Sequence, residues 1–177
     1  MDEQIKIKKL SVFLNTQLII SGFGGMKNAY SDLTPTTKSF GEMYSDISKV
    51  AKIVASQKDL IYYTTTQENW VECLKVIHDI VKNFKWQAEK FDCDDRAKLV
   101  SALCAILFGL NACGELYCEV TNIKTGNKSM HYANIIVNSK GEVCLFDVDN
   151  GGNKKILVEG QPISMGNWSY HLLAAVY

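Results

Sequence analysis

The sequence predicts an α+β fold in which helices of the N-terminal half pack against an antiparallel sheet in the C-terminal half. Apolar residues recur at every third or fourth position up to about residue 108 and at every second position afterwards, which are the periods of helices and strands. The chain has 177 residues, of which 47% are hydrophobic, enough to bury one core. We therefore expect a single domain over residues 1–177.

Helical periodicity occurs in three segments. Phe40–Gln57 and a segment from 67 to about 86 each carry apolar residues on one face. The third predicted helix begins at Cys93, because Asp92 is a residue type that caps helix N-termini. It ends at Gly109, since glycine readily adopts the left-handed conformation that terminates helices.

Strand periodicity dominates the remainder of the chain. The extended segments that we expect are Glu115–Asn122, His131–Asn138 and Glu142–Val148, with a short β-prone link at 61–66. Ser139–Gly141 is short enough to join two of these strands as a hairpin. Lys155–Glu159 favours a further strand, whereas Ser169–Val176 fits either a short helix or a last strand.

The domain divides into four parts by composition. The first 39 residues contain a stretch rich in Gly, Asn, Asp and Pro, which interrupts regular structure. We interpret the parts as an N-terminal arm and loop (1–39), a helical part (40–90), a core (91–152) and a C-terminal extension (153–177).

The charge balance argues against two classes of partner. Lys plus Arg number 19 and Asp plus Glu number 19, so no basic excess favours nucleic acid or an anionic membrane surface. The longest apolar run, Leu99–Leu110, is too short to span a bilayer. We expect neither nucleic acid nor membrane as a partner, and the oligomeric state stays open.

The six cysteines are expected to be reduced. The first residues carry acids, and the apolar run that follows is broken by polar residues, so it lacks the hydrophobic segment of a secretory signal peptide. A chain of this size can also form a core without disulfides. We therefore expect a cytoplasmic protein.

Three residues suggest chemistry by their positions: Cys93 at a helix N-terminus, His131 at the start of a strand and Asp147 near the end of the next strand. A helix N-terminus and an imidazolium both favour a thiolate, and a carboxylate fixes the orientation of an imidazole. The predicted hairpin would bring His131 and Asp147 together. Taken singly, these residues would more often be a core thiol, a strand-edge histidine and a turn acid.

No cofactor or metal is expected. The segment from Asp147 resembles a calcium loop only superficially, because Gly151 comes one position too early and position twelve is Val158 rather than Glu. The cysteines lack the paired short spacings of zinc sites.

A longer pattern resembles a known family. It comprises Cys93-Asp94-Asp95-Arg96-Ala97 on a helix, a glycine-containing turn after Phe108, His131-Tyr132-Ala133, and Leu145-Phe146-Asp147-Val148. This order and spacing are similar to those of the transglutaminase-like core, a papain-like arrangement, and look most like small bacterial or phage-type members. The resemblance covers roughly residues 91–152.

The resemblance implies roles for the three residues. Cys93 would be the nucleophile, His131 the general base and acid, and Asp147 the residue that orients His131. Candidate oxyanion donors are Gln87, Trp86 and Trp70, in addition to the backbone N–H of Cys93.

The implied activity is thiol-dependent acyl transfer. We expect hydrolysis of a peptide or amide bond in a peptide or protein substrate, since no residue marks an amine-acceptor site. The alternative is a non-catalytic binding protein that retains the same fold, for example a phage-encoded protein acting on a host factor.

Overall fold

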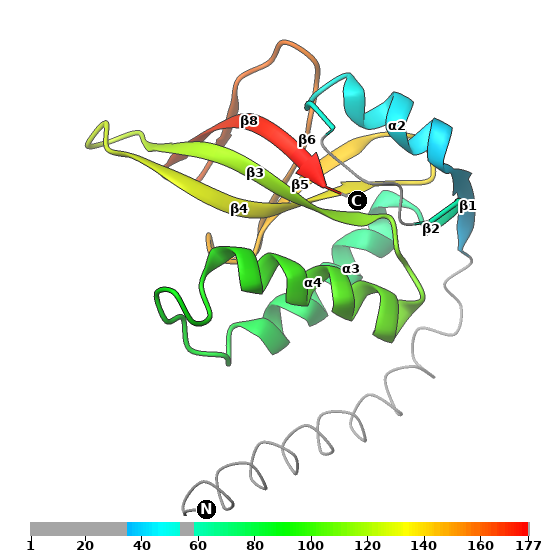
Figure 1. Cartoon of the computed structure of the whole chain (residues 1–177), viewed down its shortest axis with the longest axis horizontal. Helices are drawn as coiled ribbons and strands as arrows, with labels where there is room; N and C mark the ends of the chain where they lie inside the picture. The colour runs from blue at the N-terminus through cyan, green and yellow to red at the C-terminus, as the bar shows by residue number, and fades with distance from the viewer. Residues whose placement is uncertain (1–34, 54–58, 177) are drawn as a thin grey trace, which may run out of the picture. The chain divides into compact units, whose positions relative to one another are not determined.

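The computed structural model describes residues 35–53 and 59–176 (Figure 1). Residues 34–177 form one compact unit. Most of the predicted N-terminal arm, and the end of the first predicted helix at residues 54–57, lie outside the described residues. Among the residues that are described, no helix has both the length and the apolar character needed to cross a bilayer.

Within the described residues, three helices precede the large sheet: α2 (Phe40–Ser48), α3 (Gln67–Val81) and α4 (Cys93–Phe108). Side chains cap the first two: Ser39 and Glu42 form a capping box on α2, and the Thr66 hydroxyl accepts from the backbone N–H of Asn69 on α3. These caps, together with the predicted apolar faces, explain why each helix begins where it does.

Helix α4 confirms one predicted boundary mechanism and corrects another. Gly109 ends the helix with a φ of 67° in the left-handed region, as its residue type predicts. Asp92 occupies the N-cap position but does not cap the helix. Its carboxylate instead accepts a hydrogen bond of 3.0 Å from the backbone N–H of Glu89, because the preceding loop turns back towards it.

Two antiparallel sheets are present in the described part of the chain. The small one pairs β1 (Thr36–Ser39) with β2 (Ile61–Thr64). The large one has the order β6-β5-β4-β3-β8-β7. Its strands are β3 (Cys113–Asn122), β4 (Lys128–Val137), β5 (Val143–Asp147), β6 (Asn153–Ile156), β7 (Ile163–Met165) and β8 (Trp168–Val176).

The predicted fold class, α+β with a transglutaminase-like core, is wrong. The described part is mostly β, with eight strands and three helices. The C-terminal extension, which was ambiguous in sequence, supplies β6 at one edge of the large sheet and β7 and β8 at the other. The sheet curls until the edge strands β6 and β7 come into contact, so that it encloses much of its own core.

Helix α4 packs along one side of this sheet, against β3 and β4, and α3 lies beside α4 (Figure 1). Ala97, Val100 and Cys104 on the inner face of α4 are buried. Asn134 of β4 ties the layers together, because its amide donates to the carbonyl of Ala97 at 2.9 Å and to that of Gly114 at 3.2 Å. The helix N-terminus is thereby fixed relative to the strands.

The ladder between β4 and β5 is short, and its end defines the site. Pairing runs from Val137↔Val143 to Asn134↔Phe146 and stops there. The earlier part of β4, which includes His131, continues beside β3 alone, while the chain after Asp147 turns away. The two strands thus separate at the point where His131 and Asp147 face each other.

Candidate functional site

The three residues singled out in the sequence are brought together. His131 Nε2 lies 3.0 Å from Asp147 Oδ2, which confirms the juxtaposition that the hairpin predicted. Cys93, the first residue of α4, lies near the imidazole and contributes to the raised pKa of His131. Of the six cysteines, Cys93 is half-buried and the other five are buried.

Asp147 is the most enclosed member of this group. Its side chain is only 3% exposed, yet four groups bond to it. The Tyr170 hydroxyl donates to Oδ2 at 2.6 Å, and the backbone N–H groups of Asp149 and Asn150 donate to Oδ1 at 3.0 and 3.1 Å. With His131 as the fourth partner, this buried carboxylate has the compensation that burial requires.

The protonation states follow from these contacts. Burial by itself would lower the pKa of His131, but hydrogen bonds and charges from Asp147 and Cys93 outweigh it and raise the pKa to about 10. Burial would raise the pKa of Asp147, but its hydrogen bond and charge interaction with His131 outweigh it and lower the pKa. At neutral pH the two residues form an imidazolium–carboxylate pair.

A second ion pair lies beside the first. Arg96 Nε on α4 is 2.5 Å from Asp149 Oδ1, with side chains 7% and 20% exposed. Arg96 also donates to the carbonyl of Phe84 at 2.8 Å. This pair connects the N-terminal end of α4 to the turn after β5, near the point where β4 and β5 separate.

These groups border a pocket of about 190 Å³. It is lined by Val120, Ser129, His131, Asp147, Asp149, Asn150, Trp168 and Tyr170. The amide of Asn150 donates to the Tyr170 hydroxyl and to the carbonyl of Met165, both at 3.0 Å. A chain of hydrogen bonds therefore runs from Asn150 through Tyr170 and Asp147 to His131.

Sequence reasoning missed the contribution of the last strand. Tyr170 and Trp168 lie on β8, and the sequence left that segment open between helix and strand. Asn150 and Asp149 belong to a turn that the sequence indicates only as a run of turn-forming residues. Ser169–Val176 ends in five consecutive apolar residues, a pattern that does not distinguish a strand from a helix.

The three predicted oxyanion donors lie in different settings. Trp70 is buried in the core, where its indole N–H donates to the Thr64 hydroxyl at 3.0 Å. Trp86 is 54% exposed, and Gln87 bridges to Phe91 through backbone hydrogen bonds of 2.9 and 2.8 Å. Trp70 is thus committed to a structural hydrogen bond.

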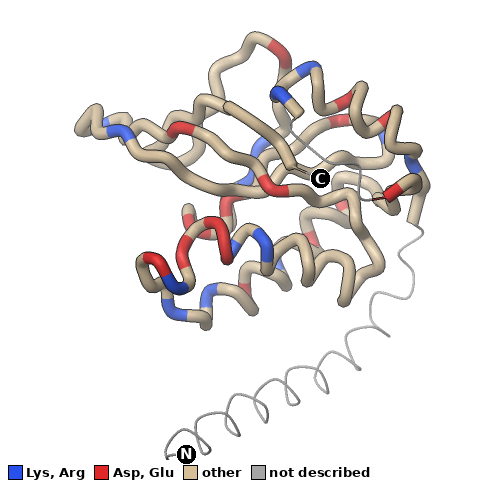
Figure 2. Tube along the Cα trace, viewed as in Figure 1, with Lys and Arg blue, Asp and Glu red and all other residues tan. Residues whose placement is uncertain are grey.

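Two groups of side chains could approach a cation. His131, Asp147 and Asp149 place ligand atoms within 4.8 Å of one another, as do the three acids at the start of α4, Asp92, Asp94 and Asp95. Figure 2 shows that acidic positions gather along the chain at the beginning of α4. In the first group a cation would compete with the proton of His131 and with Arg96 for Asp149. In the second group Lys98 lies 2.5 Å from Asp94 and 3.9 Å from Asp95, so neither group is free of a competing positive charge.

No family model and no curated protein matches the sequence. The solved structures that share the fold include the following two. A PSL1a–E64 complex aligns over 80% of this chain and 51% of its own, with a TM-score of 0.52 and 16% identity. Polyporus squamosus lectin, bound to the human-type influenza-binding epitope Neu5Aca2-6Galb1-4GlcNAc, aligns over 80% and 49%, with a TM-score of 0.52 and 13% identity. The chain thus spans about half the length of these proteins.

These comparisons correct the family expectation. The chain's fold is that of structures that include a glycan-bound lectin, and the transglutaminase-like resemblance over residues 91–152 is wrong. Two expectations rested on this resemblance and are wrong as well: hydrolysis of a peptide or amide bond, and a peptide or protein substrate. The short pattern around Cys93, His131 and Asp147 had matched local order and spacing, which are properties that unrelated folds can share.

Proposed function

We propose that this chain is a binding protein that recognises a saccharide in the pocket between β4, β8 and the turn after β5. The observation that carries the proposal is the fixed network of polar side chains beside an aromatic ring, Trp168, in one pocket. The solved structure of Polyporus squamosus lectin with its glycan supports the same class of ligand.

The polar lining matches what sugar hydroxyl groups need. Each hydroxyl both donates and accepts, so a site must present acceptors and donors in fixed directions. Asp149 supplies a carboxylate, Ser129 a hydroxyl and His131 a charged ring at the pocket wall. The hydrogen bonds from Asn150 and Tyr170 to their neighbours hold this wall before any ligand arrives, which lowers the entropy cost of binding.

Trp168 supplies the apolar part of the site. Its side chain is half-buried at the start of β8, and an indole presents a flat apolar face together with one donor. The C–H groups on one face of a sugar ring can pack on such a surface while the hydroxyls at its edge reach the polar wall. A pocket of about 190 Å³ suits a single ring, so a longer glycan would extend into solvent.

The test is a titration with monosaccharides followed by NMR, using galactose, N-acetylglucosamine and N-acetylneuraminic acid. We expect Trp168→Ala to weaken binding by about tenfold or more, because buried tryptophans dominate many interfaces. Trp86→Ala is the matched control, since Trp86 is exposed and outside the pocket lining. Absence of binding by the wild type, or equal binding by the Trp168→Ala variant, would refute the proposal.

A second function is favoured by the position of Cys93, a half-buried thiol at the N-terminus of α4 that lies near His131. We propose that Cys93 is a reactive thiol, that His131 stabilises its charged form and that Asp147 orients His131. The thiolate is the nucleophilic form of cysteine, and both an imidazolium and a helix N-terminus stabilise it. The carboxylates of Asp92, Asp94 and Asp95 at the same helix end oppose this effect.

Alkylation by iodoacetamide tests the second function. The sulfur of Cys93 forms a bond to carbon, and iodide leaves. Exposure alone would favour labelling of Cys93, so the decisive measurement compares its alkylation rate at pH 7 in the wild type and in variants of His131.

Histidine variants provide the control for this test. His131→Asn should slow the alkylation of Cys93, because the thiolate loses its neighbouring imidazolium, and His171→Asn, on the exposed side of β8, should not. Equal rates in the wild type and in His131→Asn would exclude the reactive-thiol function while leaving saccharide binding untouched.

A further inference from the structure

One oxygen of Asp147 serves two side-chain donors at once. Oδ2 accepts from the Tyr170 hydroxyl at 2.6 Å and lies 3.0 Å from Nε2 of His131. The other oxygen, Oδ1, accepts from the backbone N–H groups of Asp149 and Asn150 at 3.0 and 3.1 Å. A carboxylate offers about four acceptor positions, so these four donors fill it. The hydroxyl and the imidazole therefore compete for the same oxygen.

The direction of the Tyr170 hydroxyl is fixed by Asn150. The amide of Asn150 donates to the Tyr170 oxygen and to the carbonyl of Met165, both at 3.0 Å. Because an amide N–H cannot accept, the hydroxyl proton points to Asp147, at a distance typical of strong O–H···O⁻ bonds. Burial and the charge of Asp147 also raise the pKa of Tyr170 well above its usual value, so the hydroxyl keeps its proton at neutral pH.

The two competing donors are held by the same central strand. Tyr170 of β8, which is 5% exposed, pairs with Val120 of β3. His131 of β4 pairs with Cys118, two residues earlier on β3. Neither backbone can move away from Asp147 without breaking strand pairing. The competition for Oδ2 is therefore built into the register of the sheet.

The strength of the bond to Asp147 matters for the other side of the imidazole. Since Nε2 of His131 is bound by Asp147, Nδ1 is the ring nitrogen available to Cys93, which lies near the imidazole. A carboxylate on one ring nitrogen makes the other more basic. We propose that Tyr170 is a positioning residue, which shares Oδ2 of Asp147 with His131 and thereby limits how strongly the imidazole is bound. As a role in Cys93 reactivity, it rests on the proposed thiol function.

A purely structural role of Tyr170 makes the opposite prediction. If the hydroxyl only held Asp147 in place, its loss would loosen the carboxylate and weaken the bond to His131. If the hydroxyl competes for Oδ2, its loss leaves that oxygen to His131 alone and strengthens the bond. The two roles therefore differ in the sign of their effect on the imidazole, although both lower the free energy of unfolding.

The test follows the Nε2–H proton of His131 by NMR of the full chain at pH 7. A stronger hydrogen bond moves such a proton downfield and slows its exchange with water, and loss of the signal in His131→Asn assigns it. In Tyr170→Phe we expect a downfield shift and exchange slowed by about two- to fivefold, which a fraction of one charge-assisted hydrogen bond is enough to produce. An upfield shift, faster exchange or an unchanged signal would overturn the proposal.

Replacement of tyrosine by 3-fluorotyrosine tests the same competition in the other direction, and it does not depend on the folding of Tyr170→Phe. Fluorine makes the phenol hydroxyl a stronger donor, so the His131 proton should move upfield. Tyr132→Phe is the matched control, because Tyr132 is next to His131 in the chain and its ring packs on Tyr117, with centroids 5.0 Å apart. A downfield shift with 3-fluorotyrosine, or equal shifts in the two phenylalanine variants, would contradict the competition.

Failure of this proposal can be told apart from failure of the thiol function. Equal rates of Cys93 alkylation in the wild type and in His131→Asn would refute the thiol function, whatever the NMR signal shows. A slower rate in His131→Asn together with an unmoved Nε2–H signal in Tyr170→Phe would refute the role of Tyr170 alone. A slower rate together with a downfield signal supports both.

Discussion

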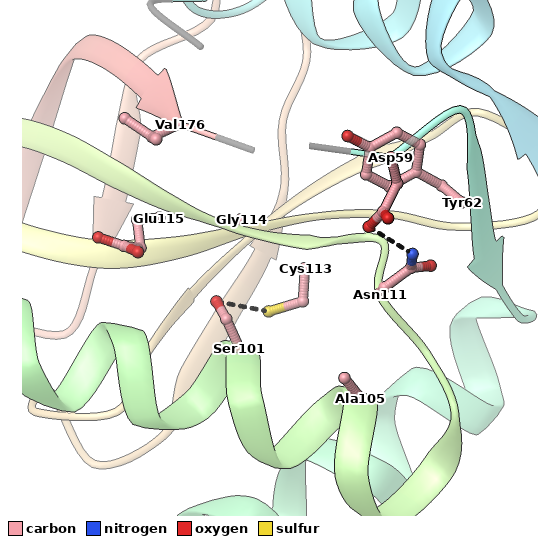
Figure 3. Close-up of a pocket in the computed structure, with 9 residues that line it drawn as sticks. All are labelled: Asp59, Tyr62, Ser101, Ala105, Asn111, Cys113, Gly114, Glu115 and Val176. Atoms are coloured by element: carbon pink, nitrogen blue, oxygen red, sulfur yellow. Dashed lines mark hydrogen bonds between the residues drawn. The ribbon is translucent and has the colours of Figure 1, made fainter. Parts of the chain in front are cut away.

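The two pockets differ in how their charges are balanced. In the pocket of His131 and Trp168, Asp147 pairs with His131 and Asp149 pairs with Arg96. A second pocket, of about 150 Å³, lies between α4, β2 and the beginning of β3 (Figure 3). Its charged residues, among those described, are Asp59 and Glu115, which lie on opposite sides and have no basic side chain beside them in the lining. The first pocket can therefore receive a neutral polar ligand without disturbing its ion pairs, whereas the second contains no ion pair within its described lining.

Because of this difference, the charged side chains of the first pocket should contribute to the stability of the fold more than those of the second. Buried ion pairs that face a pocket hold the fold together, and losing one partner leaves an uncompensated charge. Exposed carboxylates contribute little to folding and remain available to a ligand. Substitutions in the first pocket should therefore reduce the free energy of unfolding strongly, and those in the second should hardly change it.

The largest effect is expected for Asp147→Ala. This change leaves the His131 imidazolium without its carboxylate and Tyr170 without its acceptor, so we expect a loss of about 3–5 kcal/mol in the free energy of unfolding. Urea denaturation measures it. Glu119→Ala, at an exposed ion pair, serves as the control with less than about 1 kcal/mol, and similar values for both would contradict the comparison.

Raising the pH should also weaken the pair of His131 and Asp147, because it removes the proton of His131. The pKa of His131 is raised to about 10 in the folded chain, above its unfolded value of about 6.5. The stabilisation is therefore complete below pH 6.5 and declines as the pH rises towards 10. We expect the free energy of unfolding to fall between pH 6.5 and 9, and His131→Asn to remove that fall.

Arg96→Met should have the next largest effect. It leaves the partly buried Asp149 without its partner and removes the bond to the Phe84 carbonyl, and we expect a loss of about 1–3 kcal/mol. Lys98→Met, at the exposed pair with Asp94, is the matched substitution. If thermal or urea unfolding shows equal losses in the two variants, the first pocket does not depend on its second ion pair.

A smaller effect is expected for Tyr170→Phe. The ring stays in place while the hydroxyl that joins Asn150 to Asp147 is lost, so we expect about 1–2 kcal/mol of destabilisation. Saccharide affinity should also fall, because the polar wall loses part of its support. A variant of unchanged stability and unchanged affinity would mean that this hydroxyl does not organise the pocket.

The smallest effect on folding is expected for Asp59→Asn. Asp59 is exposed, and the new amide oxygen can still accept from Asn111, so the free energy of unfolding should change by less than about 0.5 kcal/mol. A loss of stability comparable to that of Tyr170→Phe would show that the second pocket is as structural as the first.

Local elements of the fold were predictable where the periodicity of apolar residues agreed with the residues that end helices and form turns. Helix α4 begins at Cys93 and ends before Gly109 as predicted, and the hairpin of β4 and β5 forms around Ser139–Gly141. The fold class was not predictable from these elements. It depends on β7 and β8, whose short or mixed patterns do not distinguish strand from helix without knowledge of the sheet edge they join.

The site was predictable only in part, for a related reason. Cys93, His131 and Asp147 lie on elements with clear patterns, so their convergence could be argued from strand pairing. Trp168 and Tyr170 enter through β8, which pairs with β3 far earlier in the chain. No local signal in the sequence specifies such a long-range pairing, and the pocket they complete could not be anticipated.

The early end of the β4–β5 ladder at Asn134 and Phe146 has a consequence for hydrogen exchange. Up to Asn134, β4 has a strand partner on the β3 side only, so every second backbone amide points to the open side. Beyond Asn134, both sides of β4 are paired. Amide exchange along this one strand should alternate between fast and slow before Asn134 and become uniformly slow after it.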